Sequence, residues 1–307
     1  MENSMSAQPG TKVVVIGGGG RLGSAVARHL SRRGCQVRSL GRAELDLSDS
    51  TRVAEMLGSL DFDTVFLSAA LTNVDYCETA RSEAMAVNAE GPAAVAAACV
   101  RKGARLVHVG TDYVYAGDDP APRHEEHAAV PASVYGESKL AGDEAVLAAD
   151  PRFLVVRTSW VFGPDRPSFL EFMIDRARQH DEVVAIADKV STPCYSLDFA
   201  ELLGPLLALP DAGGIVNLCN SGSCTWQEYA QHGIDCARRY GVPLRSDHVG
   251  AGRLADFKNF VARRPVYTAM STEKFTRLTG LRPRSWREAV EAFVRDFVAP
   301  AAVAATP

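Results

Sequence analysis

The chain has 307 residues, of which 47% are hydrophobic, and its formal net charge is −4. A chain of this size can build one large or two modest hydrophobic cores, and its mildly acidic balance argues against nucleic acid or a membrane surface as a partner. The seven cysteines include no CxxC pair, so we expect reduced thiols and a cytoplasmic location.

The N-terminal segment predicts a strand, a glycine turn and a helix in that order. Residues 1–10 are polar and are expected to form a disordered tail. Residues 13–16 are a β-branched run typical of a buried strand, and apolar residues recur at helical spacing from Leu22 onward. Between them lie three glycines at three-residue intervals: Gly17, Gly20 and Gly23. Such glycines permit a tight turn and a close approach of backbone to a pyrophosphate, so the turn, with Arg21 and Leu22, is predicted to bind a dinucleotide.

The residues after the second strand indicate which dinucleotide is bound. This strand is expected at residues 36–40, and Arg42 follows it closely. A site for NAD usually has an acidic residue near this point, whereas two guanidiniums, from Arg42 and Arg21, suit the 2′-phosphate of NADPH. Asp46 and Leu47 come next and are expected at the adenine edge. The sequence therefore favours NADPH, with NADH as the alternative.

Strands and helices alternate up to residue 165. Strands are expected at residues 64–67, 105–109 and 153–157, and an alanine-rich helix at residues 84–102. This alternation predicts an α/β fold of the Rossmann type, with a doubly wound parallel sheet. Ligands of such sheets lie beyond the carboxyl ends of the strands, where Gly17, Ala69, Thr111 and Thr158 fall. We therefore predict a dinucleotide-binding domain over residues 11–165, with one shared site at this edge.

Tyr135 and Lys139 offer a proton donor for that site. They are four residues apart, so on a helix their side chains lie on one face. A tyrosine has a pKa of about 10, and a nearby ammonium is expected to lower that pKa by favouring the phenolate. A phenol tuned in this way can deliver the proton that a carbonyl oxygen needs when hydride reduces the carbonyl carbon.

The second half of the chain has shorter segments that are richer in Pro, Trp and Arg. We expect a smaller, mostly helical substrate-binding region over residues 166–298, partly interleaved with the sheet through a strand at residues 214–218. Helices are expected within it at residues 168–179, 197–209, 226–240, 271–280 and 285–298. Residues 299–307 are rich in Ala and Pro and are expected to form a frayed tail.

One histidine-rich segment superficially suggests a metal site. Residues 124–127 read His-Glu-Glu-His, which is not the His-Glu-x-x-His order of a helical zinc site. The segment lies in a loop rich in Pro and Asp, so we predict a solvated loop and no metal.

Further motifs follow one another in a recognisable order. Thr-Asp-Tyr stands at residues 111–113, Arg-Thr-Ser-Trp at 157–160, Ser-Thr-Pro at 191–193 and Arg-Arg-Pro at 263–265. With the glycine turn and the Tyr-x-x-x-Lys pair, these motifs resemble the extended short-chain dehydrogenase/reductases and, more narrowly, the dTDP-4-dehydrorhamnose reductases. The resemblance covers roughly residues 12–297.

The resemblance implies NADPH-dependent reduction of the 4-keto group of a nucleotide-linked 6-deoxysugar. The implied reaction is dTDP-4-dehydro-L-rhamnose to dTDP-L-rhamnose, or a related 4-ketoreduction in secondary metabolism. Tyr135 would donate the proton, Lys139 would tune it and hold the nicotinamide ribose, and Thr111 would hydrogen-bond the substrate carbonyl. Further contacts are implied to the cofactor at Ala69, Ala70 and Asn88, and to the substrate at Thr72, Asp112, Tyr113 and Trp160.

Several positions depart from the family pattern, among them Arg21, where many members have glutamine, and residues 188–190, which match it loosely. Gly110 stands where the family commonly has serine, and Ala25 stands where some members carry a glutamate linked to a metal at a dimer interface. Ala25 leaves a homodimer open as the assembly but argues against that metal site.

Two other functions stay open beside reduction. One is a sugar-nucleotide epimerase of the same superfamily, which no single residue opposes, whereas Tyr113 after Asp112 opposes a dehydratase because the second carboxylate is missing. The other is a non-catalytic, cofactor-binding regulatory subunit, against which the intact Thr111, Tyr135 and Lys139 argue.

Overall fold

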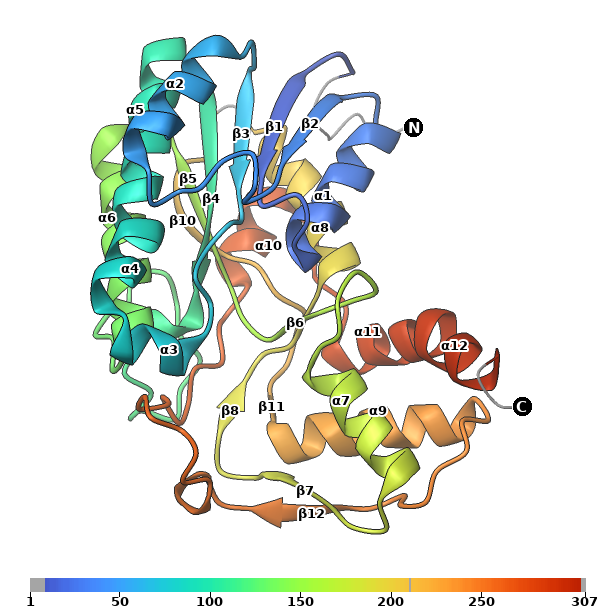
Figure 1. Cartoon of the computed structure of the whole chain (residues 1–307). Coiled ribbons are helices and arrows are strands. Elements are labelled where there is room, and N and C mark those ends of the chain that lie inside the picture. The colour runs from blue at the N-terminus through green and yellow to red at the C-terminus, as the bar shows by residue number, and fades with distance from the viewer. Residues whose placement is uncertain (1–8, 210, 305–307) are drawn as a thin grey trace.

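A six-stranded parallel sheet forms the centre of the molecule (Figure 1). The structure is a computed structural model that describes residues 9–209 and 211–304, so most of the expected N-terminal tail lies outside the described residues. The strand order is β10-β5-β4-β3-β1-β2, and all neighbouring strands run parallel. The strands are β1 (Lys12–Ile16), β2 (Gln36–Leu40), β3 (Thr64–Leu67), β4 (Arg105–Thr111), β5 (Leu154–Thr158) and β10 (Gly214–Asn217). The predicted doubly wound sheet is confirmed, and its order reverses between β1 and β3, the position at which such sheets bind ligands.

Helices cover both faces of the sheet because successive residues of each buried strand point to opposite faces. Val13 and Val15 pack with α1 (Arg21–Arg32) and α8 (Ser196–Leu207). Val14 and Ile16 pack instead with helices of the other face: α2 (Ser50–Ser59), α5 (Gly91–Lys102) and α6 (Val134–Ala149).

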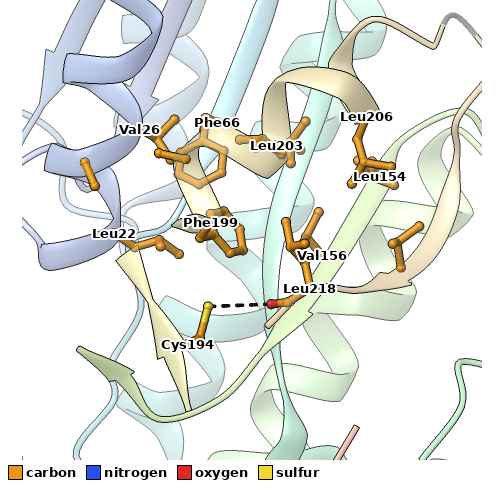
Figure 2. Close-up of a cluster of buried hydrophobic side chains, with 14 of the residues drawn as sticks. Leu22, Val26, Phe66, Leu154, Val156, Cys194, Phe199, Leu203, Leu206 and Leu218 are labelled. Carbon is orange, nitrogen blue, oxygen red and sulfur yellow. Dashed lines mark hydrogen bonds between the residues drawn. The ribbon is translucent and has the colours of Figure 1, made fainter. Parts of the chain in front are cut away.

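Figure 2 shows the packing between the sheet and α1 and α8. Leu22 and Val26 of α1 meet Phe199 and Leu203 of α8 above strand residues such as Phe66. The rings of Phe66 and Phe199 make an edge contact with centroids 6.3 Å apart. This layer holds the start of α1, and therefore the glycine turn, in a fixed position against the sheet.

The helix expected at residues 84–102 is longer and is interrupted. It begins as α4 (Arg81–Met85), passes through a π-helical segment, η1 (Ala86–Glu90), and continues as α5. Pro92 lies in the first turn of α5 and has no N–H to donate to the preceding turn, which accounts for the widened segment before it. The sequence patterns also missed two short helices that begin at side-chain caps: α2, capped by Asp49, and α3 (Val74–Thr79), capped by Asn73.

A second core lies below the sheet in Figure 1. Its helices are α7 (Phe169–Gln179), α9 (Trp226–Arg239), α11 (Trp286–Phe293), η4 (Val294–Val298) and α12 (Ala299–Ala304). Helix α10 (Glu273–Thr279) belongs instead to the first core, where it packs against β10 and α8. The short strands of the second core are β6 (Val161–Phe162), β7 (Val183–Ile186), β8 (Val190–Ser191), β9 (Cys194–Tyr195), β11 (Cys224–Thr225) and β12 (Val249–Gly252). The predicted helices and the return strand β10 are present in this half, whereas its short strands were not predicted.

Two expectations for irregular segments are correct only in part, and residues 305–307 of the expected C-terminal tail lie outside the described residues. Ala299–Ala304 form helix α12, with Ala299 and Ala302 buried against the second core, where a frayed tail was expected. Glu125 is buried rather than solvated, because its Oε1 accepts the backbone N–H of Asn217 at 2.8 Å. No helix within residues 9–209 and 211–304 is long and apolar enough to cross a bilayer.

Candidate active site

A cavity of about 770 Å³ runs along the carboxyl edge of the sheet. The cavity is lined by residues that end or follow four of the strands. These residues are Gly17 after β1, Ala69 after β3, Thr111 at the end of β4 and Thr158 at the end of β5. The predicted convergence of strand ends on one site is therefore confirmed. Apart from Asn88, every residue that the sequence assigned to catalysis, cofactor or substrate also lines this cavity.

The glycine turn, which we call the cradle, packs too tightly against backbone to hold side chains at Gly17 and Gly23. Gly17 has a φ of +94°, and a Cβ at this position would lie 2.6 Å from the backbone nitrogen of Ala69. A Cβ on Gly23 would lie 2.2 Å from the carbonyl oxygen of Gly17. Gly20 immediately precedes α1, whose first-turn N–H groups have no partner within the helix. Because such N–H groups and the positive end of the helix dipole attract anions, the cradle fits the pyrophosphate of a dinucleotide.

Arg21 and Arg42 differ in how free their guanidiniums are. Arg21 donates to three backbone carbonyls, those of Val161, Arg166 and Pro167. It therefore ties the glycine turn to the loop after β6. The side chain of Arg42 is 72% exposed, with its Nε 3.4 Å from Oδ2 of Asp46. Its Nη2 also lies 3.7 Å from Oε1 of Glu83. Because these ion pairs are at the surface and weak, Arg42 can exchange them for a phosphate more readily than Arg21 can leave its three carbonyls.

Asn88 does not reach the cavity. Its side chain is fully buried, accepts the N–H of Leu71 at 2.8 Å and donates to the carbonyl of Leu71 and to Oγ of Ser138, both at 3.0 Å. It thus fastens the loop after β3 to α6. The structure corrects its predicted role from direct cofactor contact to support of the cavity wall.

The candidate catalytic side chains come from β4 and α6. Thr111 ends β4, and Tyr135 and Lys139 lie one turn apart on α6. Two contacts fix the start of that helix: Oγ of Ser133 accepts the N–H of Gly136 at 3.2 Å, and Oε1 of Glu78 accepts the N–H of Val134 at 2.9 Å. The ring of Tyr135 packs edge-on against that of Tyr113, with centroids 5.4 Å apart. Sequence patterns did not identify Glu78, because its partner is 56 residues away in the chain.

Burial is the main cause of the shifted pKa values of Tyr135 and Lys139. It raises the pKa of Tyr135 above its usual value, and the hydrogen bond to Thr111 lowers it only in part. Burial lowers the pKa of Lys139 to about 8, although the charge of Asp143 acts to raise it. The ammonium of Lys139 donates to the carbonyl of Val109 at 2.7 Å and lies 3.2 Å from Nε2 of His108. The expectation that Lys139 lowers the pKa of Tyr135 is therefore wrong in this structure. A phenol with a raised pKa stays protonated near neutral pH, which is the state that a proton donor needs.

Asp112 lies beside Thr111 and is committed to internal contacts. Its Oδ2 accepts hydrogen bonds from the hydroxyls of Ser191, at 2.9 Å, and Thr268, while its Oδ1 lies 3.3 Å from Oγ1 of Thr111. Burial raises the pKa of its carboxyl group, and the charge of Lys189 opposes this. Asp112 can therefore orient the Thr111 hydroxyl, a role that its position in the sequence did not reveal.

Trp160 combines a strained backbone with an unused donor. Its φ of 41° lies in the left-handed region, which a bulky residue rarely adopts. Among the described residues, its buried indole N–H has no hydrogen-bond partner. Beneath it lies the buried Lys189, whose Nζ is 5.9 Å from the Trp160 ring and 5.2 Å from the Tyr113 ring. Trp160 and Tyr113 thus add aromatic surface to the lining of the cavity.

Comparisons with known proteins agree with this geometry. The family model described as RmlD substrate binding domain matches residues 11–299. A dTDP-4-dehydrorhamnose reductase of Streptomyces griseus is 36% identical over 293 residues, covering 93% of this chain and 94% of that relative. A probable dTDP-4,6-dihydroxy-2-methyloxan-3-one 4-ketoreductase of Streptomyces antibioticus is 33% identical over 289 residues, covering 93% and 95%. A crystal structure of dTDP-4-dehydrorhamnose reductase from Bacillus anthracis in complex with NADP superposes with a TM-score of 0.85 at 30% identity, covering 92% of this chain and 98% of that one.

Proposed function

The chain belongs to the dTDP-4-dehydrorhamnose reductase family, and we propose that it uses NADPH to reduce the 4-keto group of a nucleotide-linked 6-deoxysugar. The most direct substrate is dTDP-4-dehydro-L-rhamnose, with a 4-keto intermediate of secondary metabolism as the second candidate. One observation carries the proposal: the Tyr135 phenol, the Thr111 hydroxyl and the buried amine of Lys139 line the same cavity as the glycine turn.

Different residues of the cavity would bind different parts of the cofactor. The glycine turn and the first turn of α1 would hold the pyrophosphate, and Arg42 would hold the 2′-phosphate. Lys139 would hold the nicotinamide ribose. When bound, the reduced nicotinamide supplies the hydride.

Tyr135 delivers the proton in the proposed reaction. The phenol is in its protonated form near neutral pH, and it would give its proton to the alkoxide that develops at C4. Thr111 holds the carbonyl oxygen at the phenol, and Asp112 fixes the direction of the Thr111 hydroxyl. Thr72, Tyr113 and Trp160 would bind the sugar nucleotide.

The direct test supplies the purified protein with NADPH and a panel of nucleotide-linked 4-keto sugars. We expect one NADPH oxidised for each sugar reduced, with dTDP-4-dehydro-L-rhamnose the best substrate, and NMR of the product would give its configuration at C4. An epimerase would change the configuration without net consumption of NADPH. A regulatory subunit would bind NADPH and consume none.

Arg42→Ala should weaken the preference for NADPH over NADH. A charge-assisted hydrogen bond of this kind contributes about 1.5–3 kcal/mol, so the ratio of kcat/KM for NADPH to that for NADH should fall by roughly 10- to 100-fold. Arg52→Ala removes another exposed arginine from the neighbouring helix α2 and serves as the control. An unchanged ratio in Arg42→Ala would mean that another group recognises the 2′-phosphate.

We also propose a homodimer and a cytoplasmic location. The boundary between the dinucleotide-binding domain and the substrate-binding region is proposed near residue 165. Ala25 is buried in α1, which packs against α8, so it does not offer a surface position for a metal ligand. Analytical ultracentrifugation of the purified chain would determine whether it dimerises without such a site.

A further inference from the structure

A line of buried polar side chains runs behind the cavity from Lys139. Its Nζ lies 3.2 Å from Nε2 of His108, which lies 3.6 Å from Oδ1 of Asp143. Nε of Arg157 donates to Oδ2 of Asp143 at 3.1 Å. His108, Asp143 and Arg157 are each no more than 2% exposed, and of the four side chains only Lys139 lines the cavity.

The hydrogen-bond chemistry fixes the direction of the ammonium. A lysine ammonium has three N–H donors and no acceptor. Two of them are directed at the carbonyl of Val109 and at Nε2 of His108, which leaves one for the cavity. Since Nε2 must accept, the neutral ring carries its hydrogen on Nδ1. The pKa of His108 is lowered well below its usual value by burial and by the charge of Lys139, which agrees with a neutral ring.

His108 is poorly satisfied for a residue that serves only the core. Among the described residues, its Nδ1 has no hydrogen-bond partner, and neither has Oδ1 of Asp143. Buried polar groups are normally paired. The hydrogen bond that its side chain does make is with the ammonium of Lys139, which indicates that His108 serves to position that ammonium.

We propose that His108 and Asp143, which contact neither substrate nor cofactor, form a positioning pair that directs the ammonium of Lys139 into the cavity. His108 supplies the acceptor that sets the direction. Asp143 supplies the negative charge that keeps the ammonium protonated in a buried site, and Arg157 holds Asp143 in place. The inference rests on the proposed function, because it assigns a task to Lys139.

Several charged or titratable groups face Lys139 and enter the pH dependence. His108 from β4 and Asp143 from α6 act on Lys139 itself. The others act through a neighbour: Arg157 from β5 and Glu144 from α6 act on Asp143, while Cys77 from α3 and Asp112 and Tyr113 from η2 (Asp112–Val114) lie against Tyr135. Of these, Asp143 is the group whose charge raises the pKa of Lys139.

The first experiment compares His108→Gln with His108→Asn. The amide of glutamine can place its oxygen about where Nε2 lies, whereas the shorter asparagine cannot reach the ammonium. The cofactor-free protein, labelled with ¹³C-lysine, is titrated by NMR, and Lys139→Arg assigns the resonance. We expect the pKa of Lys139 to fall in His108→Asn, because a hydrogen bond to the charged form is lost, and to stay near 8 in His108→Gln. Equal titration in both variants and the wild type would overturn the proposal. So would an equal change in both, since that would reflect general damage.

The second experiment follows turnover against pH. We expect kcat to fall by about 10²-fold in His108→Asn, since misdirection by about 1 Å has effects of that size, and to be largely retained in His108→Gln. We expect Asp143→Asn to move the alkaline fall of kcat from about pH 8 to lower pH, because the charge that raises the pKa of Lys139 is gone. Glu137→Gln, which removes a carboxylate of α6 that pairs with Arg81 at the surface, should not move it. If Asp143→Asn leaves the alkaline limb in place, the charge has no part in the proposed role. The NMR titration needs no substrate, so it stands or falls separately from the reductase assignment.

Discussion

Replacing Tyr135 with phenylalanine is expected to lower kcat by about 10²–10⁴-fold, the usual contribution of a positioned proton donor. The change removes only the hydroxyl group. The ring keeps its edge contact with Tyr113, so the fold and the cavity should persist. Turnover is measured as NADPH oxidation with a 4-keto nucleotide sugar. Cofactor binding and the thermal midpoint, measured by fluorescence and circular dichroism, should remain close to those of the wild type.

A matched control is available on α3. Tyr76 is 45% exposed, and its hydroxyl donates to Oε2 of Glu83 at 2.7 Å. Tyr76→Phe therefore removes the same group from a site outside the cavity and should leave kcat unchanged. Full turnover by Tyr135→Phe would contradict the proton-donor role, and a loss of folded protein would show that the hydroxyl is structural.

The sheet and its ligand edge could be predicted because their signals are local. The bounds expected for β2 and β3 agree with the structure, since a short apolar or alternating run ends at a turn in each case. The glycine turn was also predictable, because tight packing of Gly17 and Gly23 against backbone leaves no room for a side chain. The strand ends then follow from the topology, since the carboxyl ends of parallel strands meet at one edge.

The parts that could not be predicted depend on partners far away in the chain. Arg21 was taken as a phosphate ligand, but three carbonyls about 140 residues further on occupy its guanidinium. Nothing in the sequence around Asn88 indicates that its side chain hydrogen-bonds the backbone of Leu71. The pKa of Tyr135 was expected to fall because spacing shows that Lys139 is near, whereas spacing says nothing about burial or about the competing contacts of Lys139. Site residues thus follow from motifs, but their protonation states require the surrounding structure.

Arg157→Met is expected to destabilise the fold by about 3–5 kcal/mol, because it leaves the carboxylate of Asp143 buried without its ion partner. The loss should depend on pH. The pKa of Asp143 is already raised by burial and is lowered by Arg157, so the variant raises it further. An acid whose pKa is higher in the folded than in the unfolded state makes the fold lose stability as pH rises above the unfolded value, about 4. The defect should therefore be smallest in acid and should grow toward neutral pH.

Urea unfolding of Arg157→Met at several pH values tests this expectation, with two controls that separate charge from packing. The double variant Asp143→Asn with Arg157→Met removes the stranded charge and should recover much of the lost stability together with its pH dependence. Arg152→Met removes an arginine that is 82% exposed and pairs with Asp150 at the surface, and it should have little effect at any pH. A pH-independent loss in Arg157→Met that the double variant does not relieve would mean that Arg157 acts through its packing and its contact with the Tyr115 hydroxyl. The buried charge that the proposed role of Lys139 requires would then come from a group other than Asp143.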